Sequence, residues 1–246
     1  MKHEEVIELL RNDQEYYGGI GKQYMSNSDI GVLLSNPKLY GAYRGDNKSF
    51  AAGRYFHQLI LEPDKAVDFK YIDTGTRLTK EYKEFVIENN LDFCLLKKEK
   101  EEVEDLVKVM TGNFSFFEQI YKDGNQYEVP AIGEIQGMMW KGKADIITDD
   151  CIIDLKTTSD INKFKWSAKS YNYDSQCYIY QTLFGKPLVF YVIDKLTRQL
   201  GIYTPTENFI LGGEQKVGKA IEVYKKYFSS DSTENIDNYF VQEELF

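Results

Sequence analysis

The segment from Glu128 to Lys156 constrains the fold of this chain more than any other part. It holds three runs of β-branched, aromatic and other apolar residues, separated by short pairs of turn-forming residues. We therefore expect strands over residues 127–135, 138–147 and 151–157, joined by tight turns at Gln136-Gly137 and Asp149-Asp150. This antiparallel meander predicts that a sheet forms the core of the protein.

Two-residue turns would fix the register of these strands. Asp145 would then face Asp154 on the third strand, and Glu128 would face Asp145 from the first strand. Lys156 lies two residues after Asp154, so it would share the face of the acids. The other face would receive apolar side chains, namely those of Ala144, Ile146, Ile153 and Leu155.

A row of acids on one sheet face is destabilising unless something neutralises it. A divalent cation reverses the effect, because Mg²⁺ prefers hard oxygen ligands. Lys156 beside such a metal could orient or deprotonate a water and offset charge on a phosphate. The alternative is a solvent-facing sheet in which Lys156 only pairs with Asp154. Glu134 has the same parity as Glu128 but lies near the turn, so Glu128 is the preferred third acid.

The rest of the chain predicts helices before the sheet and further helices and strands after it. Asn27, Ser28 and Asp29 offer helix-capping groups, and Pro37 and Pro63 end helices. The expected helices cover residues 6–12, about 28–36, 49–62, 80–89, 97–121, 168–184 and 214–228, and two more strands cover 188–194 and 199–203. The fold class is α/β (α+β) with a helical lobe in front. We expect a helical part at 1–125, the core at 126–228 and an acidic tail at 229–246.

Composition excludes some classes of protein. A net charge of −9 argues against a simple basic nucleic-acid coat, although it says nothing about local patches. Part of the charge lies in the tail, which we expect to be mobile and to repel stray DNA; its acids are Asp231, Glu234, Asp237, Glu243 and Glu244. Three scattered cysteines favour a reducing cytosol over a disulfide framework or zinc ribbon. The sequence shows no signal peptide and no apolar run of membrane-spanning length, which predicts a cytoplasmic protein without a membrane partner.

Asp145 followed by Asp154-Leu155-Lys156 resembles the D…(D/E)xK core of the PD-(D/E)XK nuclease superfamily. Further motifs occur in the order typical of its RecE/RecB-like phage-type exonucleases, the exonuclease VIII-like group. They are an S-x-S…P segment from Ser26 to Pro37, GRYFH at 53–57 with LEP at 61–63, DLKTT at 154–158, and Q-x-x-x-Y at Gln176 and Tyr180. Ala144 stands where the superfamily name has proline, and Asp154 takes a slot often held by Glu.

The resemblance implies a restriction-endonuclease-like core, with a central mixed sheet flanked by helices. It implies one or two Mg²⁺ ions, for which Mn²⁺ would substitute, held by Asp145, Asp154, Glu128, His57 and the Leu155 carbonyl. From its residues alone, His57 would be a core or boundary residue of an amphipathic helix. An iron–sulfur cluster, found in a related branch with four cysteines, is excluded by the cysteine count.

Gln176 and Tyr180 are four residues apart and so share one face of the expected helix. They could simply pack in a stripe with Tyr173 and Phe184. The resemblance instead implies that they lie near Lys156 or the substrate phosphate. Three lysines and a tryptophan that could hold a DNA backbone follow the strand with DLKTT; they are Lys163, Lys165, Trp166 and Lys169. Arg54, one helical turn from His57, could contact a phosphate at a DNA end. An ordinary solvated loop is the alternative for the first four.

The resemblance predicts hydrolysis of phosphodiesters at double-stranded DNA ends, in phage recombination or replication inside the bacterial cytoplasm. The implied partners are DNA, a single-strand annealing protein and further copies of the chain in a ring. Two alternatives remain. One is a structure-specific or restriction-type endonuclease on the same fold. The other is a non-catalytic acidic DNA mimic, which would have no need of Lys156 within the acidic row.

Overall fold

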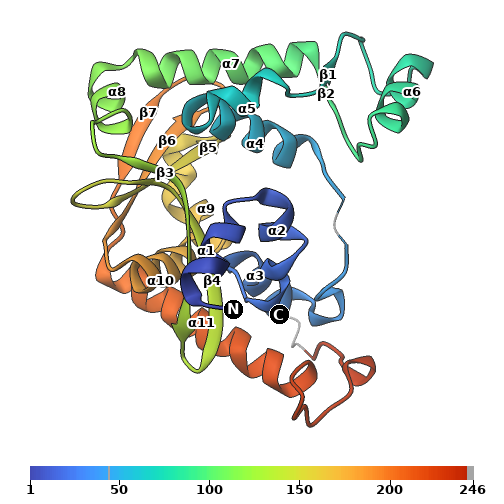
Figure 1. Cartoon of the computed structure of the whole chain (residues 1–246), viewed down its shortest axis with the longest axis vertical. Helices are drawn as coiled ribbons and strands as arrows, with labels where there is room; N and C mark the ends of the chain where they lie inside the picture. Colours follow the sequence, from blue (N-terminus) through green and yellow to red (C-terminus); the bar gives the residue numbers. More distant parts are fainter. Residues whose placement is uncertain (44, 243–246) are drawn as a thin grey trace.

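A five-stranded mixed sheet forms the centre of the computed structural model, which describes residues 1–43 and 45–242 (Figure 1). The strand order is β3-β4-β5-β6-β7, antiparallel except for the parallel pair β5–β6. The strands are β3 (Gln126–Ile135), β4 (Met138–Ile147), β5 (Ile152–Thr158), β6 (Leu188–Asp194) and β7 (Leu200–Tyr203). The expected α/β class and the mixed sheet flanked by helices are thereby confirmed.

The register of the meander is the one that the two-residue turns predict. Ile135 pairs with Met138 across Gln136-Gly137, both of which have the positive φ that this tight turn requires. Ile147 pairs with Ile152 across the second turn, where the Thr148 backbone N–H also donates to the Cys151 carbonyl. The three strands therefore place residues 128, 145 and 154 side by side.

Helices cover both faces of the sheet (Figure 1). One face packs on α4 (Lys48–Leu61), α7 (Lys97–Gly112) and α8 (Phe114–Ile120). The other packs on α9 (Phe164–Ser170), α10 (Tyr173–Phe184) and α11 (Glu207–Tyr227). The β3–β4 hairpin is also covered by α1 (His3–Leu10), α2 (Asp13–Tyr17) and α3 (Asn27–Ser35).

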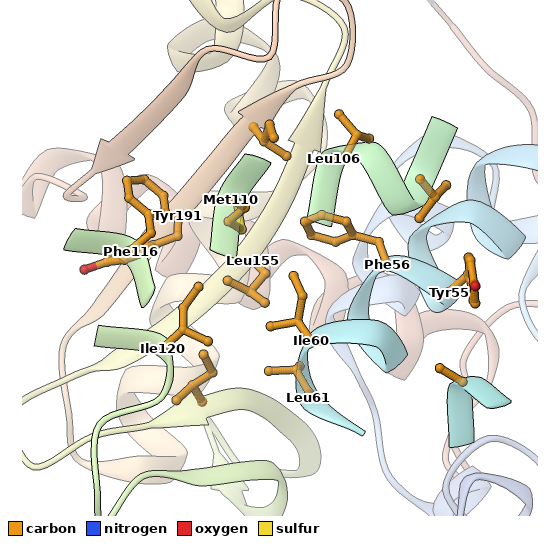
Figure 2. Packing of buried hydrophobic residues seen from close by; sticks show 14 of the residues in the cluster. Tyr55, Phe56, Ile60, Leu61, Leu106, Met110, Phe116, Ile120, Leu155 and Tyr191 are labelled. Carbon is orange, nitrogen blue, oxygen red and sulfur yellow. The ribbon is translucent and has the colours of Figure 1, made fainter. Parts of the chain in front are cut away.

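The largest hydrophobic cluster fixes α4 against the sheet (Figure 2). Phe56 and Ile60 on α4 point toward Leu155 on β5, while Leu106 and Met110 of α7 lie above them in the view and belong to the same cluster. All five side chains are almost completely buried. Burial of this apolar face holds the register of α4, and so it sets the position of His57, the residue after Phe56.

Several helix boundaries differ from the predicted ones. The expected helix 97–121 is broken at Asn113, whose side chain caps α8, and the helix 168–184 is broken at Asn172, which has a left-handed φ of 58°. The last helix begins at Glu207 instead of Glu214, because Thr206 caps it. One expected helix is found with nearly its predicted bounds, namely α6 (Lys80–Glu88). The prediction missed several short elements. They are the helices α2 and α5 (Pro63–Val67), the parallel strands β1 (Tyr71–Ile72) and β2 (Leu95–Leu96), and the 3₁₀ turns η1 (Ile20–Gln23), η2 (Pro37–Leu39), η3 (Ile161–Lys163) and η4 (Ile236–Asn238).

The described part of the acidic tail makes contacts with the rest of the fold. Glu234 pairs with Lys226 at 3.1 Å, and the Asp237 carbonyl accepts a hydrogen bond from Lys38 at 3.0 Å. The segment is therefore less free than a mobile tail would be, while Glu243 and Glu244 lie outside the described residues.

Within the described residues, no helix is both long and apolar enough to span a membrane. The division at 125 and 228 stays a prediction.

Two neighbouring glycines of α11 test how closely this helix packs on α10. A Cβ at Gly213 would lie 2.0 Å from the Asp174 carbonyl oxygen, whereas one at Gly212 would meet nothing nearer than 3.8 Å. Gly213→Ala should destabilise the fold by about 1–3 kcal/mol, because two helix backbones must separate. Gly212→Ala should stabilise it by about 0.5–1 kcal/mol through helix propensity. Urea unfolding of both variants checks this, and a Gly213→Ala protein as stable as wild type would contradict it.

Candidate active site

The ladder between β4 and β5 stops at Asp145. Backbone pairing runs through Ile146 and Ile153, and beyond it the Asp145 carboxylate takes over: its Oδ2 accepts a hydrogen bond from the Leu155 backbone N–H at 2.7 Å. The side chain of Asp145 therefore occupies the place of a strand partner. This spreads the two strands and leaves the carboxylates of Asp145 and Asp154 close to each other at the gap.

Strand β3 departs from regular geometry at the same level. Glu128, opposite Asp145, has a φ of +49°, and pairing on β3 resumes on both sides of it. The faces of β4 also switch here: Ala144 packs in the cluster under α10, and Ile146 packs in the cluster under α4. The predicted common face for Ala144 and Ile146 is thus wrong, because an irregular pair at residues 128 and 145 lies between them.

His57 connects α4 to this gap. Its Nδ1–H donates to the Gly53 carbonyl at 2.8 Å, so the other ring nitrogen faces the strands. There Nε2 lies 3.0 Å from Asp145 Oδ2 and 3.1 Å from the Leu155 carbonyl oxygen. Burial opposes a charge on the ring, but the adjacent Asp145 carboxylate outweighs it and raises the pKa of His57 to about 9. The ring is therefore a cation at neutral pH in the metal-free protein.

Asp154 and Lys156 form a second charged pair on the α10 side of the sheet. Lys156 Nζ lies 2.5 Å from Asp154 Oδ1, and Gln176 on α10 donates to Asp154 Oδ2 at 2.6 Å. Asp154 is only 1% exposed, and this burial raises the pKa of its carboxyl to about 6. Burial also opposes the charge of Lys156, but Asp154 outweighs it and raises the pKa of the ammonium well above its usual value. Lys156 also lies over the Tyr173 ring at 4.8 Å.

Gln176 and Tyr180 have different surroundings although they share one helix face. Gln176 orients the Asp154 carboxylate. The Tyr180 hydroxyl donates to the Lys143 carbonyl of β4 at 3.0 Å and so braces the strand, and among the described residues no hydrogen bond joins it to Lys156.

The structure brings Glu128 to the site and keeps Glu134 away from it. Glu128 is half-buried, and burial together with the nearby Asp145 charge raises the pKa of its carboxyl to about 8. Glu134 is exposed and pairs with Met139 near the hairpin turn.

The predicted DNA-contacting residues lie on exposed surface. Lys163 pairs with Asp160 at 3.2 Å, and Lys165 lies 4.2 Å from the ring of Trp166, which is 62% exposed. Lys169 is exposed on α9. Arg54 is half-exposed and pairs with Asp46. Contact with DNA stays a prediction for all five.

Two buried lysines near the site were missed. Lys141 and Lys143 are less than 10% exposed and alternate on β4 toward Asp145. The Lys-Gly-Lys-Ala-Asp pattern of 141–145 would have indicated a shared polar face. Their partners on α2, Tyr16 and Asp13, could not be predicted, because the contacts join segments far apart in sequence.

The donor atoms at the gap suit a hard divalent cation. An imidazole nitrogen, a carboxylate oxygen and a backbone carbonyl oxygen converge at His57, Asp145 and Leu155, and the buried Asp154 Oδ1 has the Lys156 ammonium as its partner. In the part of the chain that the structure describes, no three His, Cys, Asp or Glu side chains form a closed metal cage. Here His57 and Lys156 neutralise one acid each instead.

This sheet, with Asp145 and the Asp154–Lys156 pair at the point where two strands part, defines a PD-(D/E)XK nuclease fold. Residues 37–235 match the family described as a PDDEXK-like domain of unknown function (DUF3799), and the chain belongs to that family.

A solved structure agrees on the fold. A protein from Eubacterium rectale, provisionally described as an exonuclease, matches with a TM-score of 0.64 and 20% identity over 96% of both chains. SSO0001 is more distant, with a TM-score of 0.38 and 12% identity over 89% of this chain and 85% of its own. No curated protein matches the chain.

The pairing of His57 with Asp145 has a measurable consequence in metal-free protein. The His57 ring should titrate near pH 9, and Asp145→Asn should lower its pKa by about 1–3 units, because the opposing charge is lost. The pKa of His57 in the folded protein exceeds the ordinary histidine value of 6.5, so this stabilisation is complete below pH 6.5 and is lost as pH rises through 9. NMR of the ring protons measures it; a midpoint at or below 6.5, or no change in Asp145→Asn, would contradict the pairing.

Proposed function

We propose that this protein is a Mg²⁺-dependent deoxyribonuclease that degrades double-stranded DNA from its ends. The observation that carries the proposal is the convergence of His57 Nε2, Asp145 Oδ2 and the Leu155 carbonyl beside the Asp154–Lys156 pair. Membership of a PDDEXK-like family supports phosphodiester hydrolysis. The description of the structural neighbour as an exonuclease supports attack at ends.

The metal ligands would be His57, Asp145, Asp154 and the Leu155 carbonyl, with Glu128 completing the site. A bound Mg²⁺ would supply Lewis-acid activation of the phosphate and of the attacking water. The protein prepares this arrangement locally. Gly53 keeps the proton on His57 Nδ1, so that deprotonation frees Nε2, and Gln176 holds Asp154 Oδ2 while Oδ1 faces Lys156.

Lys156 acts in this proposal as a fixed cation. Its pKa is raised by Asp154 despite burial, so it stays protonated at neutral pH and is unsuited to remove a proton from water. Its ammonium would orient the attacking water and balance the charge that builds on the phosphate in the transition state. The Tyr173 ring beneath Nζ would help to keep the ammonium in place with Asp154 bound to a metal.

A role in phage recombination, with an annealing protein as partner and a ring of copies around DNA, stays part of the proposal. It rests on the resemblance to RecE-type exonucleases.

The nuclease assay compares linear duplex DNA with a covalently closed circle in Mg²⁺. We expect loss of the linear DNA alone, and a decrease of roughly 100-fold or more in Lys156→Ala and Asp145→Asn, because charge stabilisation or metal binding is lost. Lys108→Ala, which removes an exposed lysine of α7, is the matched control and should remain active. Cutting of the circle would favour an endonuclease. No cleavage of either DNA in Mg²⁺ would overturn the proposal and favour the non-catalytic DNA mimic.

Metal binding should release protons, because Glu128 and His57 have pKa values of about 8 and 9 in the metal-free protein. Both groups must lose their protons to serve as ligands, so affinity for Mn²⁺ should rise as pH increases from about 6 to about 9. Calorimetry in two buffers of different ionisation enthalpy would show the release of about one to two protons at neutral pH. Heats independent of buffer and an affinity independent of pH would contradict this ligand set.

A further inference from the structure

A carboxylate of α2 bridges two lysines from different parts of the fold. Asp13 Oδ1 lies 2.6 Å from Lys143 Nζ on β4, and Asp13 Oδ2 lies 3.5 Å from Lys65 Nζ on α5. Each oxygen of one anion thus faces its own cation. Two non-bridging oxygens of a phosphodiester would meet the same pair of ammonium groups in the same way.

Both lysines are held by other groups as well. Lys143 Nζ lies 4.6 Å from the centre of the Tyr16 ring and 5.8 Å from that of Tyr17, and its side chain is 7% exposed. Lys65 pairs with Glu62 at 2.6 Å. The two ammonium groups would therefore stay in place if Asp13 moved away.

The bridge lies next to the candidate active site. Lys143 precedes Asp145 by two residues on β4, a distance of about 7 Å along a strand. The charge of Lys143 also lowers the pKa of Glu128, the third acid of the site, against the larger effects of burial and Asp145. Asp13 itself is 45% exposed, so a ligand can reach the bridge from solvent.

We propose that Lys143 and Lys65 form a binding site for a DNA backbone phosphate near the scissile one, and that Asp13 occupies this site until DNA displaces it. The proposal rests on the proposed function, because the nucleic-acid substrate would supply the phosphate. Asp13 then acts as an internal competitor. It neutralises two cations that would otherwise attract stray anions, and DNA must exchange with it.

The test is binding of linear duplex DNA, followed by fluorescence anisotropy in chelator, so that no cleavage occurs. Asp13→Asn should bind roughly five-fold more tightly than wild type, because the competing charge is gone. Asp64→Asn is the matched control: it makes the same change of net charge on exposed surface beside Lys65, and its affinity should be clearly lower than that of Asp13→Asn.

Removal of the cations should have the opposite effect. Lys65→Met and Lys143→Met should weaken binding, and the slope of log K against log salt should decrease in magnitude by about 1, as expected for one lost phosphate contact. Lys65 is 44% exposed, so its variant tests the site even if Lys143→Met does not fold.

Equal affinity of Asp13→Asn and Asp64→Asn for DNA, or weaker binding of DNA by Asp13→Asn, would overturn the proposal. Asp13 would then only stabilise the fold through its ion pairs with Lys65 and Lys143. The two proposals fail separately. Mg²⁺-dependent cleavage of linear DNA together with an unchanged Asp13→Asn affinity would overturn the phosphate site alone. Tighter binding by Asp13→Asn without cleavage by the wild type would overturn the nuclease alone.

Discussion

The hydrogen bond from the Leu155 backbone to Asp145 is the interaction on which the site depends. A regular ladder would pair β4 and β5 through backbone groups alone and would direct neighbouring side chains to opposite faces. At Asp145 a side chain takes the place of a strand carbonyl. The strands part, the Leu155 carbonyl is exposed to His57, and the carboxylates of Asp145 and Asp154 meet at the gap.

Charge in this gap is balanced within the protein. Buried acids are costly unless they are paired, and the structure supplies His57 to Asp145 and Lys156 to Asp154. Asp13 and Lys143 repeat the arrangement at the next level of β4. In the proposed function, His57 would give up a proton to bind the metal, Asp154 would exchange Lys156 for the metal, and a phosphate would exchange with Asp13. The negative net charge of the chain is therefore compatible with a DNA substrate.

The sequence allowed the central sheet to be predicted in detail, because two tight turns determine the register of all three strands. It did not reveal the irregular pair at Glu128 and Asp145, since glutamate is not a residue type that signals a positive φ, and so the face of Ala144 was predicted wrongly. Helix breaks at Asn113 and Asn172 were missed because Asn tolerates both helix interiors and caps. His57 was singled out through the family resemblance. No local pattern indicates Asp13, whose partners lie 52 and 130 residues away.

The most direct test of the account is the position of a bound metal. Anomalous diffraction from crystals soaked in Mn²⁺ would locate the ion without assuming any activity. The account predicts a peak bounded by His57 Nε2, the Asp145 and Asp154 carboxylates and the Leu155 carbonyl, and its loss in Asp145→Asn. A peak elsewhere, or none at saturating Mn²⁺ in crystals of the wild-type protein, would contradict the account.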